Sequence, residues 1–162
     1  MDNIMNRVLL IALLFCGLFT SNVFAESTPQ NSNKINLIKK IYAMKISEKY
    51  LNVDIVKQHS GNDLKQLISR RDALEQKYPH EMCDWVRNLL IPGNDFDVKL
   101  NQMKFTILNN GLVRAQGVNF GEKFHVDYQV QCHGQSCKIE DIYDPNSYKK
   151  ELIAVIRKNK CY

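Results

Sequence analysis

The sequence predicts an α+β fold, because helical patterns at both ends of the chain enclose a run of strand patterns. Apolar residues recur every three or four positions from residue 35 to about residue 78. They alternate with polar residues between 103 and 143, and helical spacing returns after Pro145. We therefore expect N-terminal helices, a curved antiparallel sheet of about four strands and a C-terminal helix. A composition of 44% apolar and 24% charged residues excludes collagen-like, coiled-coil and wholly disordered chains.

Residues 1–25 have the pattern of a secretory signal peptide. Arg7 precedes a nearly continuous apolar run at 8–19, and Val23-Phe24-Ala25 resembles a signal-peptidase site. We expect cleavage after Ala25 and a periplasmic or secreted domain, because the apolar run is too short to span a membrane. Lipidation of Cys16 is the lesser alternative, since bulky Phe15 stands where lipoprotein processing requires a small side chain.

Two segments are expected to follow the signal peptide. Residues 26–34 contain Ser, Thr, Pro, Gln and Asn without a periodic apolar residue, which predicts a flexible lead-in. Residues 35–162 are long enough for a single domain with its own core. Cleavage would remove one acid and one base, so the domain keeps the net charge of +5 of the whole chain.

Four cysteines remain after residue 25, an even number that predicts two disulfides in an exported protein. Cys132 and Cys137 are separated by four residues typical of a hairpin loop, which favours a bridge between them and leaves Cys83 for Cys161. A zinc site is the alternative, but no Cys-x-x-Cys pair is present. We therefore expect neither a metal nor a cofactor.

The first half of the domain should be helical. A stripe that begins at Ile35 and ends at Tyr50 predicts a helix over about 35–52, and a second stripe predicts a helix over 64–78. His59 lies between them in an expected polar linker, and a short helical turn is expected over 82–90. The breakers at 91–95 end the helical part.

Four strands are expected next, over 103–108, 112–120, 124–132 and 137–143. Asn109-Asn110-Gly111 supplies the positive φ values of a tight hairpin turn. Asp144 and Pro145 then suit the cap and first turn of a last helix. Its apolar stripe contains Tyr148, Leu152, Val155 and Ile156.

One pair of polar residues could support acid–base chemistry. If Cys132 lies opposite Cys137, Tyr128 lies opposite Asp141 on the apolar face of the same hairpin. Burial raises the pKa of such a carboxyl, which prepares a general acid or base. The favoured interpretation is structural: the two groups bond to each other, or Asp141 binds backbone amides at the rim of the sheet.

Other patterns are less informative. The chain has no serine-nucleophile motif, no glycine-rich phosphate loop and no pair of histidines at ligand spacing. Basic residues on the first helix, with Lys149, Lys150, Arg157 and Lys158 on the last, could attract an anionic surface or an acidic protein. Nucleic acid is not expected as a partner, because no basic run is interleaved with aromatic residues on the strands.

The end of the sheet carries a resemblance to a known family. Residues 137–143 read Cys-Lys-Ile-Glu-Asp-Ile-Tyr, and residues 147–152 read Ser-Tyr-Lys-Lys-Glu-Leu. With the early helix and the loop at 83–96, they resemble small exported bacterial proteins of the nuclear transport factor 2-like, or cystatin-like, superfamily. The resemblance covers most of 35–158 and implies a cone in which a bent sheet wraps helices. Some relatives enclose a pocket with an acid–base dyad, in the region of Tyr128 and Asp141, and others bind partners.

The leading functional interpretation is an exported, non-enzymatic binding domain, such as an inhibitor or immunity protein against a toxin that acts in the envelope. One alternative is a small-molecule acid–base enzyme that uses Asp141 and Tyr128 inside the cone. The other is an envelope factor whose basic helices contact anionic surfaces. An apolar cavity beside Asp141 would favour the enzyme, whereas a filled core with an external patch would favour partner binding.

Overall fold

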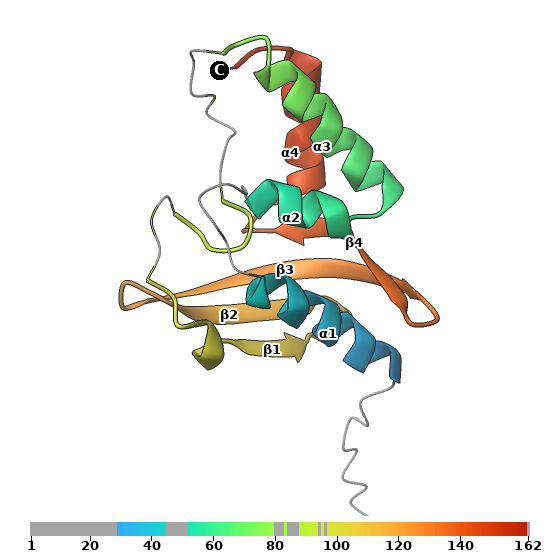
Figure 1. Ribbon diagram of the computed structural model, residues 1–162, viewed down its shortest axis with the longest axis vertical. Coiled ribbons are helices and arrows are strands. Elements are labelled where there is room, and N and C mark those ends of the chain that lie inside the picture. Colours follow the sequence, from blue (N-terminus) through green and yellow to red (C-terminus); the bar gives the residue numbers. More distant parts are fainter. Residues whose placement is uncertain are drawn as a thin grey trace, which may run out of the picture.

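The computed structural model describes residues 29–44, 52–79, 83, 88–93, 95 and 97–161 (Figure 1). The predicted α+β class is confirmed: helices precede and follow a four-stranded antiparallel sheet. The expected signal peptide, its cleavage site and Cys16 lie outside the described residues. Within the described ranges, no helix is both long enough and apolar enough to cross a membrane.

The sheet is a meander in which each strand pairs with the next. Its strands are β1 (Lys104–Ile107), β2 (Val113–Asn119), β3 (Glu122–His133) and β4 (Ser136–Tyr143). Gly111, with φ +81°, occupies the β1–β2 turn that the Asn-Gly step predicts. Alternation gives the sheet two unlike faces: Ala115 and Val126 are fully buried on one, whereas Arg114 donates two 2.7 Å hydrogen bonds to Asp127 on the other.

Helix α1 (Pro29–Ala43) lies across the apolar face of the sheet, which it contacts through Ile38, Ile41 and Tyr42 (Figure 1). The prediction of a flexible lead-in was wrong for residues 29–34. Pro29 suits the first turn of a helix, and the polar residues after it need no apolar partner on the outer side of that turn. The helix was expected to reach residue 52 but ends at Ala43, and residues 45–51 lie outside the described ranges.

Helices α2 (Asn52–His59) and α3 (Asn62–Glu75) meet at a tight corner. The placement of His59 in a polar linker was wrong, because it is the last residue of α2. Val56 of α2 is fully buried, and the backbone N–H of Gly61 donates to the carbonyl of Ile139 at 2.8 Å. That bond fixes the corner to β4. The short helical turn expected over 82–90 is absent from 88–90, and most of the rest lies outside the described residues.

Helix α4 (Tyr148–Lys158) packs beside α3 at the β4 edge of the sheet (Figure 1). The expectation that Asp144 caps this helix was wrong. The N-cap is Ser147, whose Oγ accepts a hydrogen bond from the Lys150 N–H at 3.1 Å. The helix ends at Lys158, and the next residue, Asn159, is a left-handed C-cap with a φ of +50°.

The structure contains the two disulfides that the sequence favours, Cys132–Cys137 and Cys83–Cys161. The first links directly opposed residues of β3 and β4. The second ties the end of α4 to the segment that follows α3, and both of its cysteines are 1% exposed.

The two bridges should differ in their contribution to stability. They span 78 and 5 residues, and chain entropy predicts about 4–5 kcal/mol for the longer loop and about 2 kcal/mol for the shorter one. We expect Cys83→Ala/Cys161→Ala to lower the free energy of unfolding more than Cys132→Ala/Cys137→Ala, as measured by urea denaturation. Equal losses would show that entropy of the unfolded chain does not govern either bridge.

Candidate functional site

The expected contact between Tyr128 and Asp141 is wrong, because β4 contains a bulge. Val130 lies opposite Ile139 as predicted, but Gln129 lies opposite Asp141, so Glu140 is an extra residue in β4. One extra residue shifts every later pair by one position. Tyr128 therefore lies opposite Ile142 rather than Asp141.

Tyr128 is fully buried between α1 and the segment at 88–91. Its hydroxyl lies 2.9 Å from the hydroxyl of Tyr42 and donates to the carbonyl of Leu89 at 3.4 Å, while Tyr42 donates to the carbonyl of Leu90. Burial raises the pKa of both phenols, and the neighbouring phenol raises that of Tyr128 further. Both groups therefore stay protonated and hold a buried loop against the sheet.

Asp141 is 5% exposed and lies near the end of β4, within hydrogen-bond distance of the start of α4. One carboxylate oxygen accepts the backbone N–H of Ile142 at 2.8 Å and that of Lys149 at 2.9 Å. The other oxygen accepts the hydroxyl of Ser147 at 2.6 Å. The structural interpretation of Asp141, as an acceptor of backbone amides at the rim, agrees with this geometry.

The basic residues that the sequence singled out on the last helix differ in exposure. Lys150, Arg157 and Lys158 are exposed, whereas Lys149 is half-buried and lies 3.6 Å from a carboxylate oxygen of Asp63. Helix α1, which carries Lys39 and Lys40, lies over the sheet in the lower half of the view, whereas α4 lies in the upper half beside α3 (Figure 1). The two basic helices therefore do not merge into one cationic face.

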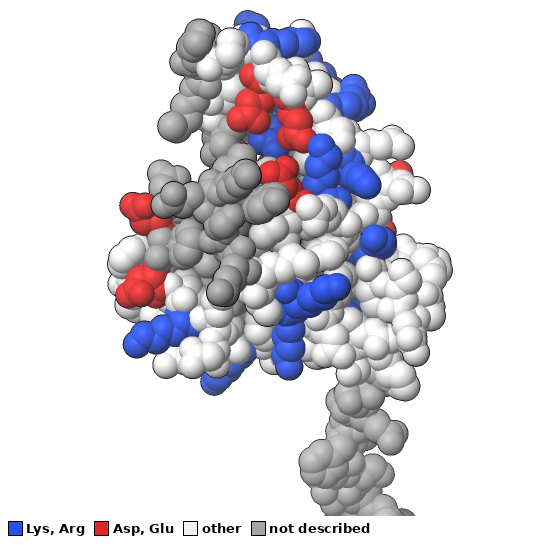
Figure 2. Space-filling view, in the orientation of Figure 1, with Lys and Arg blue, Asp and Glu red and all other residues white. Residues whose placement is uncertain are grey.

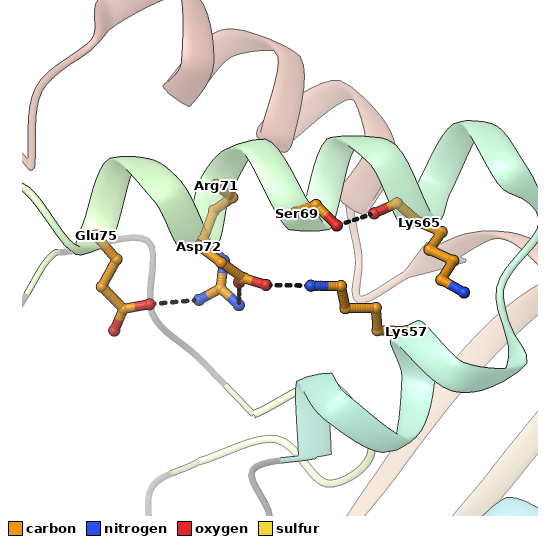
Figure 3. A network of polar contacts seen from close by, with 6 residues as sticks. All are labelled: Lys57, Lys65, Ser69, Arg71, Asp72 and Glu75. Carbon is orange, nitrogen blue, oxygen red and sulfur yellow. Dashed lines mark hydrogen bonds and ion pairs between the residues drawn. The ribbon is translucent and has the colours of Figure 1, made fainter.

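A network of ion pairs joins α2 to α3, and the sequence did not reveal it (Figure 3). The guanidinium of Arg71, whose side chain is 5% exposed, lies 2.7 Å from Asp72 and 3.2 Å from Glu75. Lys57 of α2 donates to the other oxygen of Asp72 at 2.6 Å. Only the helical spacing of Arg71 and Glu75 could have indicated part of this network.

An open cleft of about 460 Å³ lies beside this network. Its lining includes Val53, Asp54, Arg71, Asp72, Glu75 and Tyr78. Figure 2 shows acidic and basic side chains mixed over this part of the molecule. Lys57 and Arg71 already pair with Asp72, and Arg71 also pairs with Glu75. The cleft is therefore a polar surface on which two of the three carboxylates are paired. In the described part of the chain, no three His, Cys, Asp or Glu side chains converge as metal ligands.

His59 is an unusual histidine at the junction of three elements. Its Nε2 atom is buried without a hydrogen-bond partner at the end of α2. Burial lowers the pKa of the imidazole, and the positive charges of Lys40 on α1 and Lys138 on β4 lower it further. The folded structure therefore favours neutral His59.

The β2–β3 turn, at 119–122, and the end of β2 before it form a surface feature that the sequence analysis missed. Phe120 is 65% exposed and Val118 is 49% exposed, the two largest exposures among the large apolar side chains described. Phe120 also has a positive φ, of +47°. The signal that could have found this turn is Gly121, which follows an aromatic residue between two strand patterns.

No protein-family model matches this chain, and comparisons with curated proteins and with solved structures find no similar protein. Inferences about function therefore depend on the geometry of the chain itself.

The hydrogen bonds that Asp141 accepts at the start of α4 should contribute strongly to stability. Asp141→Asn would replace one carboxylate oxygen by an NH2 group, which cannot accept hydrogen bonds, and would remove the negative charge, so donors at the start of α4 would lose an ionised acceptor. We expect a loss of about 2–3 kcal/mol in the free energy of unfolding, measured with urea. Asp63→Asn, at an exposed ion pair, is the control and should change stability by less than about 0.5 kcal/mol. A loss no larger than that of the control would show that the hydrogen bonds of Asp141 are not important for stability.

His59 should make stability depend on pH. Its pKa in the folded state lies below the unfolded value of about 6.5, so the unfolded chain binds the proton more readily. The contribution of neutral His59 to the free energy of unfolding is therefore present above pH 6.5 and is lost as the pH drops below that value. His59→Gln should flatten this decline in urea denaturation at pH 7.5 and 5, whereas the control His133→Gln, at the exposed last residue of β3, should keep it. An unchanged slope in His59→Gln would assign the decline to other groups.

Proposed function

We propose that this chain is an exported, non-enzymatic domain that binds a protein, and that it acts as an inhibitor or immunity protein against a toxin in the envelope. The supporting observation is a contrast between interior and surface. The carboxylate of Asp141 accepts three hydrogen bonds from the chain itself, and Tyr128 is sealed in the core. The surface, in contrast, presents exposed apolar side chains at the β2–β3 turn.

Export is part of the proposal. Its support is the pair of disulfides, which form and persist in oxidising compartments, together with the pattern of residues 1–25. Membership of the nuclear transport factor 2-like superfamily is also part of it. A helix across one face of a four-stranded antiparallel sheet and a serine that caps the following helix are features that fit this resemblance.

An envelope factor that contacts anionic surfaces is the second candidate function. Lys150, Arg157 and Lys158 are exposed on one helix and could bind phosphate groups of lipid or lipopolysaccharide. Their separation from the lysines of α1 reduces the charge available to any single flat surface (Figure 1). Protein binding therefore has the stronger support.

The test is the capture of partners by the affinity-tagged protein, produced from the full chain, from envelope extract of the cells that make it. We expect one protein in stoichiometric amount, identified by mass spectrometry, and undiminished capture by Tyr128→Phe at a temperature where that variant is folded. A co-purifying small molecule without a protein would favour the enzyme. Sedimentation with phosphatidylglycerol vesicles that Lys150→Glu/Arg157→Glu/Lys158→Glu abolishes would favour the envelope factor.

A further inference from the structure

The β2–β3 turn holds an aromatic residue in a backbone conformation that aromatic residues avoid. Asn119 pairs with Glu122, so the turn has two central residues, Phe120 and Gly121, with φ values of +47° and +84°. This geometry normally selects Asn followed by Gly, because the left-handed region is strained for a bulky side chain. Phe120 therefore occupies a position where Asn would be more stable.

The turn is also anchored by hydrogen bonds to another segment. The side-chain amide of Asn119 donates to the carbonyls of Pro92 at 3.3 Å and Asp95 at 3.2 Å, and its oxygen accepts the N–H of Asp97 at 2.9 Å. These three bonds engage the NH2 group and the oxygen of the amide, and they attach the turn to the segment that contains Pro92, Asp95 and Asp97. Phe120 is thus presented on a prepared backbone, which lowers the entropy that an interface must offset on binding.

Phe120 and Val118 differ from ordinary exposed apolar residues. Single exposed apolar side chains are normal, and Leu100 and Ile153, at 39% and 43% exposure, are examples elsewhere on the surface. Here the two most exposed ones lie two positions apart on a turn with a strained, anchored backbone. An aromatic residue in such a position has the properties of an interface anchor.

The charge around the turn indicates the kind of partner. Three acidic residues near the turn are exposed: Asp95 and Asp97, whose backbone groups bond to the Asn119 side chain, and Glu122. Lys123, which pairs with Val118, is the basic residue beside them. Figure 2 shows red side chains at the left of the view, beside the place where Figure 1 shows the turn. An acidic surround on a chain of net charge +5 disfavours an anionic membrane and favours a basic protein surface.

We propose that the β2–β3 turn docks into a folded protein partner, with Phe120 in an apolar socket and the carboxylates of Asp95, Asp97 and Glu122 facing a basic rim. This inference rests on the proposed function, because it names the surface that a protein-binding domain would use.

The experiment places the photocrosslinking amino acid p-benzoylphenylalanine at position 120 and, as a control, at position 153 of the full chain in the producing cells. We expect a crosslink to one protein from position 120 and none to that protein from position 153. That partner is then purified and its affinity measured for wild type, Phe120→Asn and Ile153→Asn.

Phe120→Asn should weaken binding about thirtyfold or more, the fold-change that corresponds to about 2 kcal/mol for a hot-spot side chain. Its thermal stability should match or exceed that of wild type, because Asn tolerates the positive φ. Ile153→Asn should keep wild-type affinity. Asp95→Asn/Asp97→Asn should slow association and reduce its dependence on salt, because charges at a rim steer the encounter.

The outcomes separate this inference from the proposed function. A partner that binds wild type and Phe120→Asn equally would overturn the docking role of the turn and leave the binding domain intact. Binding to phosphatidylglycerol vesicles that depends on Phe120 would overturn the assignment of a protein socket. Failure of the wild-type chain to bind any protein would overturn both proposals.

Discussion

A buried carboxylate determines how the last helix meets the sheet. The extra residue Glu140 shifts β4 by one position, which brings Asp141 to the start of α4. There its two oxygens engage a backbone N–H of the helix and the hydroxyl of Ser147, so a negative charge lies at the positive end of the helix dipole. This direction of α4 carries Cys161 to Cys83, and α3 packs against the side of α4. The packing of α3 and α4 thus depends on the bulge at Glu140 and on the carboxylate of Asp141.

A buried pair of tyrosines holds the loop at 88–91 against the sheet. Tyr42 from α1 and Tyr128 from β3 share a hydroxyl contact and bind two consecutive carbonyls, of Leu89 and Leu90. The carbonyls of an irregular loop would be costly to bury without donors, and the two phenols supply them. Because both hydroxyls serve backbone groups, this tyrosine pair stabilises the packing of the loop against the sheet.

The features that the sequence predicted well are those with a short, regular period. Alternation placed Val126 and Val130 on the buried face, and the spacing of Cys132 and Cys137 set the β3–β4 turn. A single-residue bulge has no period, so the register that follows it was wrong at Asp141. Helix α2 was missed because eight residues contain only two helical turns. The anchoring of the β2–β3 turn by Asn119 depends on a loop more than twenty residues earlier, which local patterns do not show.

The distribution of charge explains why the β2–β3 turn is a better docking surface than the basic helices. Helix α1 lies over the sheet, whereas α4 packs beside α3 at the β4 edge, so the lysines of the two helices are on separate elements (Figure 1). Exposed charges on separate elements support each other little where salt screens them, with a Debye length of about 8 Å at physiological ionic strength. At the turn, by contrast, two exposed apolar side chains on an anchored backbone lie near the exposed acidic residues Asp95, Asp97 and Glu122, with Lys123 opposite Val118. Charge there can orient an encounter, and apolar contact can then hold it. The positive φ of Phe120 costs about 1–2 kcal/mol of stability, a cost that Asn at the same position would reduce.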